Sequence, residues 1–186
     1  MTEFKEFPKI HRYSRNVVVT EKLDGTNAAI IIEGGKVVGT QSRSRLITPE
    51  DDNYGFAKWV QDHQENIEYV IGMHDGHHFG EWWGQGIQRK YGMKRKVFSL
   101  FNVARWGHLG IPLEDELAIG SVPVLWNGAM DELDVSMEMD RLKENGSYAA
   151  PGFFNPEGIV IFHENSYSLF KKTFEKDAEG KGQVAA

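Results

Sequence analysis

Three short apolar runs near the amino terminus constrain the fold more than any other feature. Residues 16–20, 27–33 and 36–40 are rich in valine, isoleucine and threonine, which favour strands. Gly34 and Gly35 separate the second and third runs, as in a tight hairpin turn. The sequence therefore predicts an antiparallel meander, with the polar segment between the first two runs fixed at a strand end.

Strand and helix patterns alternate along the rest of the chain. Apolar residues recur at helical spacing from Phe56 to His63, after an N-cap signal, which predicts an amphipathic helix to about residue 67. Residues 72–80 read as a turn before a strand, and residues up to 15 as an entry segment that packs by its aromatic side chains. Further strands are predicted over residues 97–103, 122–126, 158–162 and 168–174, and a helix over 131–145.

Composition and charge narrow the class of protein. The chain has 186 residues, no cysteine and a formal net charge of −6, so disulfides and cysteine-ligated zinc are excluded. The first residues are charged and lack an apolar core, so we expect no signal peptide, no membrane anchor and a cytoplasmic location. The negative charge argues against indiscriminate nucleic-acid binding but allows a local basic groove. We expect one domain over residues 1–186, with a flexible tail at about 175–186.

The segment at residues 21–27, Glu-Lys-Leu-Asp-Gly-Thr-Asn, carries the strongest chemical signal. A lysine with a reference pKa of about 10.4 attacks only as the neutral amine, so it needs a nearby cation, a metal ion or a dry pocket. Strand alternation puts Lys22 and Asp24 on one face, and Gly25 permits the turn that returns Asn27 toward it. We interpret Lys22 as a nucleophile toward phosphorus; the alternative is a hairpin corner in which Asp24 and Gly25 are only turn residues.

Four later residues stand in contexts that suit nucleotide or metal binding. Arg43, in Ser-Arg-Ser-Arg, suits phosphate or ribose oxygens, or lies on a solvated edge strand. Glu81 is framed by aromatics where a strand should be buried, so we expect it to accept hydrogen bonds from a ligand hydroxyl or a basic neighbour. Phe101 suits stacking on a base, although core packing is commoner for a strand phenylalanine. Glu157 opens an apolar strand, where a carboxylate can hold Mg²⁺.

Two more segments, one with two lysines and one with three histidines, allow more than one interpretation. In the run 169–173, alternation puts Lys171 and Thr173 on one face and Lys172 on the other. Because a lysine inside a strand is costly unless it meets an anion, we expect one of the two to point at phosphate. The histidines at positions 74, 77 and 78 do not match the spacing of ligands on a helix face, so a loop or hairpin tip is favoured over a metal site.

Six of these segments resemble, in sequence and in order, the motifs of the covalent nucleotidyltransferase superfamily of ATP-dependent DNA ligases, RNA ligases and mRNA capping enzymes. They are EKLDGTN, SRSR, FGEWWG, FSLFNV, PEGIVIF and LFKKT. The run FGEWWGQGIQRKYG, followed by FSLFNV, is most similar to nick-sealing, phage-type RNA ligases. The resemblance covers residues 17–173.

The resemblance implies a fold and a reaction. The fold is the α+β nucleotidyltransferase (ATP-grasp-like ligase adenylation) fold, in which two antiparallel sheets flanked by helices hold the nucleotide between them. The reaction is that of an ATP-dependent RNA ligase: Lys22 attacks the α-phosphate of ATP, keeps AMP as a phosphoramidate and passes it to a 5′-phosphate, which a 3′-hydroxyl then attacks. Mg²⁺, with Mn²⁺ as a substitute, is the implied metal, and RNA ends or a nicked duplex are the implied partners.

The resemblance also implies roles for matching residues. Asp24 completes the motif of Lys22, Glu81 accepts from the ribose hydroxyl, Phe101 stacks on adenine, Glu157 is associated with the metal, and Lys171 contacts the α-phosphate. The remaining expected nucleotide-binding residues are Glu21, Asn27, Arg43 and Lys172.

The sequence departs from the family pattern at three places. Thr173 stands where relatives have a second lysine, so Lys172 would substitute only if a bulge turned it inward. Asn102 stands where relatives commonly have an acidic residue. We expect no C-terminal oligonucleotide-binding domain, which leaves either a compact ligase or a core that needs a partner domain or protein. The alternatives are a DNA ligase, a capping guanylyltransferase core, or a non-catalytic nucleotide- or RNA-binding module.

Overall fold

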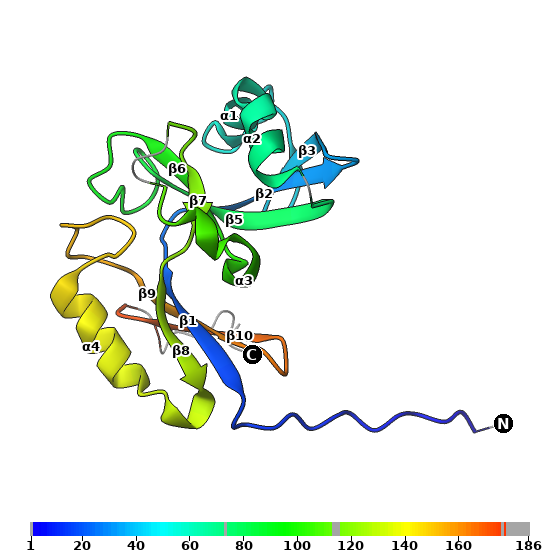
Figure 1. Cartoon of the computed structure of the whole chain (residues 1–186), viewed down its shortest axis with the longest axis vertical. Helices are drawn as coiled ribbons and strands as arrows, with labels where there is room; N and C mark the ends of the chain where they lie inside the picture. Colours follow the sequence, from blue (N-terminus) through cyan, green and yellow to red (C-terminus); the bar gives the residue numbers. More distant parts are fainter. Residues whose placement is uncertain (1, 73, 113–115, 176, 178–186) are drawn as a thin grey trace, which may run out of the picture.

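Two β-sheets form the frame of the protein in the computed structural model, which describes residues 2–72, 74–112, 116–175 and 177 (Figure 1). The smaller sheet is antiparallel, with the strand order β10 (Ser168–Thr173), β9 (Gly158–His163), β1 (Asn16–Lys22) and β8 (Val124–Ala129). The larger sheet has the order β4 (Leu46–Ile47), β3 (Lys36–Ser42), β2 (Thr26–Glu33), β5 (Gly76–Gly84), β6 (Lys96–Leu100) and β7 (Ile119–Ser121). It is antiparallel except for the pair β6 and β7.

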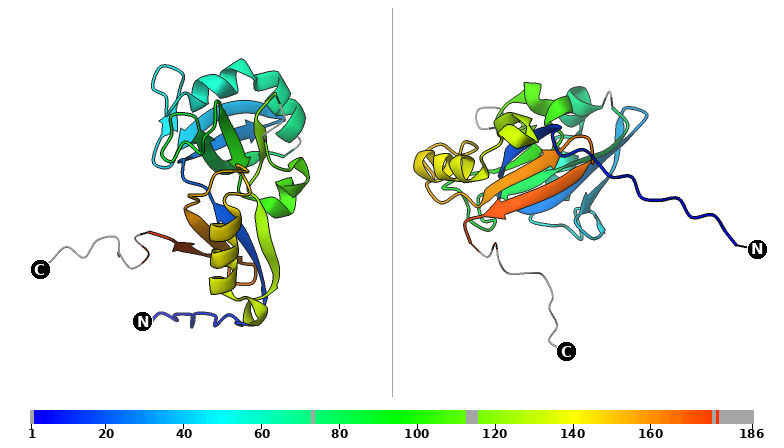
Figure 2. Two further views of the ribbon diagram at one scale, coloured as in Figure 1. Left: turned by 90° about the vertical axis from the view of Figure 1, so that its left-hand side faces the viewer. Right: turned by 90° about the horizontal axis from the view of Figure 1, so that it is seen from below.

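Helices cover the outer side of each sheet (Figure 2). On the larger sheet lie α1 (Phe56–Asp62) and α2 (Gln64–Ile71), and α4 (Val135–Asn145) packs on the smaller sheet. The described residues also form three shorter helices: α3 (Val103–Trp106) and the 3₁₀ helices η1 (Gly107–Leu109) and η2 (Met130–Glu132). In the described part of the chain, no helix is long and apolar enough to cross a membrane.

Three apolar clusters hold these layers together. The first joins Ile30 and Trp82 of the larger sheet to Phe56 of α1, and the third joins Val19 of β1 to Leu142 of α4. The second lies where the two sheets meet, and its fully buried centre is the Trp83 side chain. It contains Leu23, Trp83, Tyr91, Val97, Ala118, Val122, Ala149 and Ala150. Because Leu23 follows Lys22 directly, this cluster anchors the segment that carries the proposed nucleophile.

The three strands predicted near the amino terminus form, each slightly longer than predicted, and the hairpin of β2 and β3 is confirmed. The predicted meander was wrong, because β1 pairs with β8 and β9 in the smaller sheet and not with β2. Four other local predictions were also wrong. The helix from residue 56 is broken at His63, whose φ is −119°. The strand β5 begins at Gly76, inside the predicted turn, because its first residues pair with the end of β2. The strand β6 ends at Leu100 because the Asn102 side chain accepts a hydrogen bond from the N–H of Arg105 and caps α3.

The fourth concerns the segment before β1. Its large side chains do not pack: Phe4 is 91% exposed, and Phe7 and Ile10 are more than 80% exposed. The segment leaves the body as an extended arm, which Figure 1 shows at the amino terminus. The predicted tail lies mostly outside the described residues.

Candidate active site

Lys22, the last residue of β1, lies beside an acid that is distant in sequence. Its Nζ atom is 2.6 Å from Oε2 of Glu157, and the two side chains are 23% and 19% exposed. The pairing of β1 with β9 creates this contact, because Lys22 lies opposite Gly158, the residue after Glu157. Gly158 is required there: its φ is +150°, and a Cβ atom would lie 2.1 Å from the carbonyl oxygen of Lys172. The close approach of β9 to β10 at Gly158 therefore fixes Glu157 beside Lys22.

Glu81 is buried and hydrogen-bonded, as its sequence context predicted, although its partners belong to the segment after Lys22. The N–H of Gly25 donates to Oε1 of Glu81 at 2.9 Å, and Nδ2 of Asn27 donates to Oε2 at 2.9 Å. Burial raises the pKa of Glu81 to about 7, against the lowering effects of the Gly25 N–H and the Lys22 charge. The carboxyl group therefore gains a proton easily, and it lies within electrostatic reach of the proposed nucleophile.

Gly25 is needed for a different reason from the tight turn that the sequence predicted. A Cβ atom on Gly25 would lie 2.4 Å from the carbonyl oxygen of Trp82 and 2.7 Å from Cβ of Trp83. The segment after Lys22 therefore lies directly against the backbone of β5. Only glycine permits this close approach, which brings the Gly25 N–H to Glu81.

Two residues that the sequence did not single out hold Asp24. Its backbone N–H donates to Oη of Tyr91 at 2.8 Å, and its Oδ2 atom lies 3.1 Å from Nε of Arg89. Arg89 also donates from Nη1 to the carbonyl oxygen of Asn155 at 3.3 Å, and its Nη2 lies 3.5 Å from Oε2 of Glu175. Arg89 therefore connects three chain segments that surround Lys22. The sequence signal for Arg89 was the similarity of the run FGEWWGQGIQRKYG to RNA ligases, and this similarity assigned Arg89 no role.

The loop that carries these two residues has an unusual backbone. Gln88, Lys90 and Tyr91 have φ values of 42°, 61° and 49°, in the left-handed region that side chains other than glycine rarely adopt. Such strain persists only where the surrounding structure enforces it. The buried ring of Tyr91, which packs edge-on against Trp83 at 5.0 Å between centroids, supplies part of that support.

The two lysines of β10 point to opposite faces of the smaller sheet. Lys171 lies opposite Val160, which lies opposite Thr20, so Lys171 shares the face of Lys22. The pairing of β10 with β9 has no register shift, so no bulge turns Lys172 inward. Lys172 lies on the other face, where its Nζ contacts Oδ2 of Asp177 at 2.5 Å. The structure therefore does not bring Lys172 to the candidate site.

Glu21 also lies on the other face of β1. Its carboxylate is buried and accepts hydrogen bonds from the N–H groups of Tyr148, at 2.8 Å, and Ala149, at 3.0 Å. Burial raises the pKa of Glu21, although hydrogen bonds with Ser147 and these two N–H groups oppose the rise. The side chain thus secures the loop after α4, and the structure does not bring it to the candidate site.

The remaining predicted residues lie on the inner face of the larger sheet or at its edge. Asn27 and Glu81 are opposite each other on β2 and β5. Phe101 follows β6, its N–H donates to the carbonyl oxygen of Phe79 at 3.0 Å, and its ring is 42% exposed, free to stack on a base. Arg43 follows β3 and is exposed; within the described residues, its side chain makes no hydrogen bond or ion pair.

The acids of the site suit a hard cation only in part. The described residues contain no group of three or more metal-ligating side chains, and the histidines near β5 form none. Mg²⁺, however, is commonly held by one or two carboxylates together with water and substrate phosphates. Glu157, beside Lys22, fits that mode of binding.

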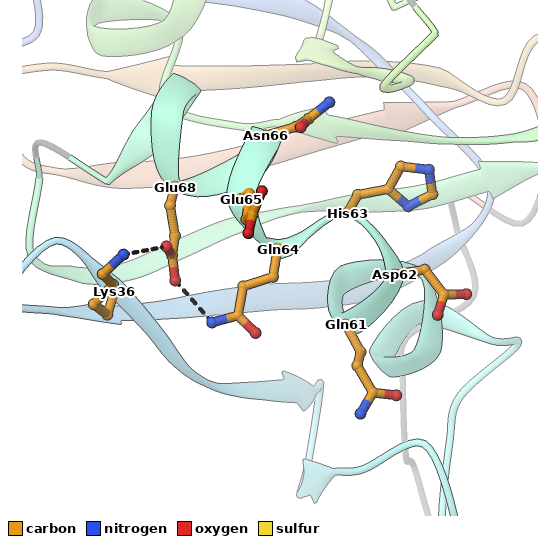
Figure 3. A pocket seen from close by; sticks show the side chains of 8 residues that line it. All are labelled: Lys36, Gln61, Asp62, His63, Gln64, Glu65, Asn66 and Glu68. Atoms are coloured by element: carbon orange, nitrogen blue, oxygen red, sulfur yellow. Dashed lines mark hydrogen bonds and ion pairs between the residues drawn. The ribbon is translucent and has the colours of Figure 1, made fainter.

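The hollow of about 530 Å³ shown in Figure 3 lies elsewhere. It is next to the junction of α1 and α2, where Lys36 pairs with Glu68 at 2.8 Å. Acidic side chains, among them Asp62 and Glu65, line it, and Lys22, Glu81 and Glu157 do not. Its charge does not favour a nucleotide, so we place the candidate site at Lys22.

Comparison with known proteins identifies the family of the chain. The sequence profile of the RNA ligase family matches residues 15–173. The chain belongs to the RNA ligase family. The matched range contains Lys22, Glu81, Arg89 and Glu157. No curated protein matches the sequence.

Solved structures share the fold of this RNA ligase family member. A Naegleria gruberi RNA ligase variant with ATP and Mn superimposes with a TM-score of 0.60 at 16% identity, covering 86% of this chain and 49% of that one. A second variant of that ligase with AMP and Mn gives 0.59 at 16% identity, covering 87% and 50%. The same ligase with PPi gives 0.59 at 18% identity, covering 86% and 50%. The chain thus spans about half the length of these ligases, and the predicted α+β nucleotidyltransferase fold is confirmed.

Proposed function

We propose that this chain is the adenylation domain of an ATP-dependent RNA ligase, in which Lys22 becomes covalently linked to AMP. The observation that carries the proposal is the position of Lys22 at the end of β1, partly buried, 2.6 Å from Glu157 and close to the buried Glu81. Family membership supports the reaction class. The Naegleria ligase structures with ATP, AMP and Mn support an adenine nucleotide and a divalent cation.

The ion pair with Glu157 holds the side chain of Lys22 in the candidate site. Glu157 is also the carboxylate proposed to hold Mg²⁺ or Mn²⁺, which when bound would supply positive charge that stabilises the leaving pyrophosphate. Glu157 would thereby exchange its lysine partner for the cation.

The proposed reaction proceeds in three displacements at phosphorus. Lys22 Nζ forms a bond to the α-phosphorus of ATP as the bond to pyrophosphate breaks. A 5′-phosphate oxygen of RNA then forms a bond to the same phosphorus as the N–P bond breaks, and Lys22 is restored. Finally, a 3′-hydroxyl attacks the activated 5′-phosphate and AMP leaves. The protein contributes mainly position and fixed charge to these steps.

Residues around Lys22 have distinct proposed roles in binding ATP. Glu81, positioned by Gly25 and Asn27, accepts from a ribose hydroxyl, and Phe101 stacks on adenine. Lys171 contacts the α-phosphate from the face of the sheet that it shares with Lys22. Arg43, exposed beyond β3, contacts the nucleotide or the RNA end, and Asp24 orients the segment after Lys22.

The natural partners are proposals too. We propose RNA ends or a nicked duplex as the substrate, a further domain or protein that helps to hold the RNA, and a cytoplasmic location, with which the lack of cysteine is compatible. Residues 1–186 would act as one domain.

The first test is incubation of the purified protein with α-labelled ATP or GTP and Mg²⁺, followed by denaturing electrophoresis and mass spectrometry. We expect AMP on Lys22, and none in the Lys22→Ala variant. Lys58→Ala is the matched control, because Lys58 is exposed and pairs only with Asp62 in its own helix. A GMP adduct would indicate capping chemistry, and the absence of any adduct would contradict the proposal.

A further inference from the structure

The inner face of the larger sheet remains open beyond the proposed nucleotide contacts. The pairing of β2 with β5 places Asn27 opposite Glu81, Ala29 opposite Phe79, and Ile31 opposite His77, so these six side chains share one face. The opposite face is covered by α1 and α2. Next to Trp83 the inner face is closed by the second apolar cluster. In the described part of the chain, the clusters that pack helices on this sheet contain none of the inner-face side chains from Glu81 to His77.

Two aromatic rings on this open face have no assigned role in binding ATP. Phe79 is 52% exposed, although it lies in the middle of a six-stranded sheet. The ring of His77, which is also exposed, lies 5.9 Å from the Phe79 ring at an interplanar angle of only 16°. Adjacent exposed aromatic rings on an open sheet face can mark a ligand-binding surface. The two rings stack on each other and form an exposed aromatic platform two residues along β5 from Glu81, which a further flat ring can extend.

The chemistry around this platform favours a nucleic-acid base as its ligand. Phe101 comes directly after β6, the strand next to β5, and its N–H donates to the carbonyl oxygen of Phe79, so the two rings lie next to the residue proposed to stack on adenine. Gln41, opposite Ala29 on β3, supplies a polar edge, and the exposed cation of Arg43 follows two residues later. Open sheets with exposed aromatic rings bind unpaired RNA bases by stacking, with little demand on sequence.

We propose that Phe79 and His77 stack an unpaired RNA base close to the end that is joined, beside the adenylate on Phe101. The proposal rests on the proposed ligase function, because that function brings RNA to this face. It assigns to the open sheet a role in holding RNA that is separate from the chemistry at Lys22.

The test uses single-stranded RNA with a 5′-phosphate and 2-aminopurine at successive positions near that end. Stacking of 2-aminopurine on a ring quenches its fluorescence, so a titration reports both affinity and which base is stacked. We expect quenching with the unmodified protein and a loss of affinity of about 5- to 150-fold in Phe79→Ala, the range expected from base stacking. Phe79→Trp should restore quenching, and His77→Ala should weaken it less than Phe79→Ala.

Phe170→Ala is the matched control, because Phe170 is 53% exposed but lies on β10, on the face away from Lys22. Equal affinities of Phe79→Ala and Phe170→Ala for RNA, or no quenching with the unmodified protein, would overturn the proposal. Adduct formation with ATP alone is measured in parallel. If it falls as much as RNA affinity in Phe79→Ala, Phe79 belongs to the nucleotide pocket and the proposal is wrong. Quenching without any adduct in the unmodified protein would instead contradict the ligase function.

Discussion

Arg89 Nε lies 3.1 Å from Oδ2 of Asp24, which joins the strained loop after β5 to the segment that follows the proposed nucleophile. The Arg89 side chain is only 15% exposed, so solvent screens this contact weakly. The same side chain contacts Asn155, just before β9, and Glu175, just after β10. We therefore expect Arg89 to position Lys22 without contacting the phosphate that Lys22 is proposed to attack.

Arg89→Ala should slow adduct formation by at least about tenfold, an estimate equivalent to about 1.4 kcal/mol in the barrier. It should lower the free energy of unfolding by roughly 1–3 kcal/mol, the range for hydrogen bonds to charged groups. Initial rates with labelled ATP and urea unfolding measure the two effects. Lys90→Ala is the control, because the neighbouring side chain is exposed. Equal rates in both variants would show that Arg89 does not position the site.

Gly25→Ala should destabilise the protein by roughly 1–3 kcal/mol, because the added methyl group meets the Trp82 carbonyl and Trp83. Adduct formation should fall as well, since the N–H of Gly25 would move away from Glu81. Gly107→Ala is the matched control: no atom lies within 4 Å of its added Cβ, and its φ of −56° suits alanine. Thermal unfolding that does not distinguish the two variants would contradict the close approach.

Lys171→Ala should reduce adduct formation by about 10- to 100-fold, an estimate for the loss of one charge-assisted phosphate contact. Lys172→Ala should stay within about twofold, because its side chain lies on the other face of β10 and pairs with Asp177. Adduct yields at limiting ATP separate the two variants. A larger loss of adduct in Lys172→Ala than in Lys171→Ala would contradict the proposed role of Lys171.

Glu157→Ala should raise the Mg²⁺ concentration needed for half-maximal adduct formation, because the variant lacks the carboxylate proposed to hold the cation. The matched control is Glu164→Ala, which removes an exposed acid just beyond the same strand. A Mg²⁺ titration of each variant is the measurement. Identical curves for Glu157→Ala and the unmodified protein would remove Glu157 from the metal site.

The raised pKa of Glu81 has a consequence for stability. Between its unfolded value of 4.5 and about 7, the folded protein binds the proton more tightly than the unfolded chain, so stability falls as the pH rises through this range. The full effect is about 3 kcal/mol, from about 1.4 kcal/mol per pKa unit. Urea unfolding at pH 5 and pH 7.5 should show a smaller fall in Glu81→Gln than in the unmodified protein. Parallel pH dependences would contradict the raised pKa.

Local periodicity was enough to predict part of the site. Strand alternation correctly put Lys171 on one face of its strand and Lys172 on the other. The same rule, applied to β1, would have placed the Glu21 side chain on the other face of the sheet from Lys22, away from the candidate site. Burial and hydrogen bonding of Glu81 also followed from its apolar surroundings, because a carboxylate there needs partners.

Contacts between distant segments could not be predicted in this way. The role of Arg89 depends on Asp24, Asn155 and Glu175, none of which is near it in the sequence. The exposure of Phe4 in the arm was missed because an aromatic side chain gives the same signal whether or not a partner covers it. The sequence thus indicates which residues carry the chemistry, whereas the fold determines which side chains hold them.

The strand order of the smaller sheet determines when Lys22 and Glu157 can first come together during synthesis of the chain. Lys22 is made early in synthesis, yet β1 lies between β8 and β9, and Glu157 follows 135 residues later. Pairing over such separations is slow to form, because the entropy of closing a long loop must be lost first. A ribosome-bound chain that has not yet reached β9 would therefore carry Lys22 without Glu157 or the completed sheet, and we expect it to form no adduct with ATP.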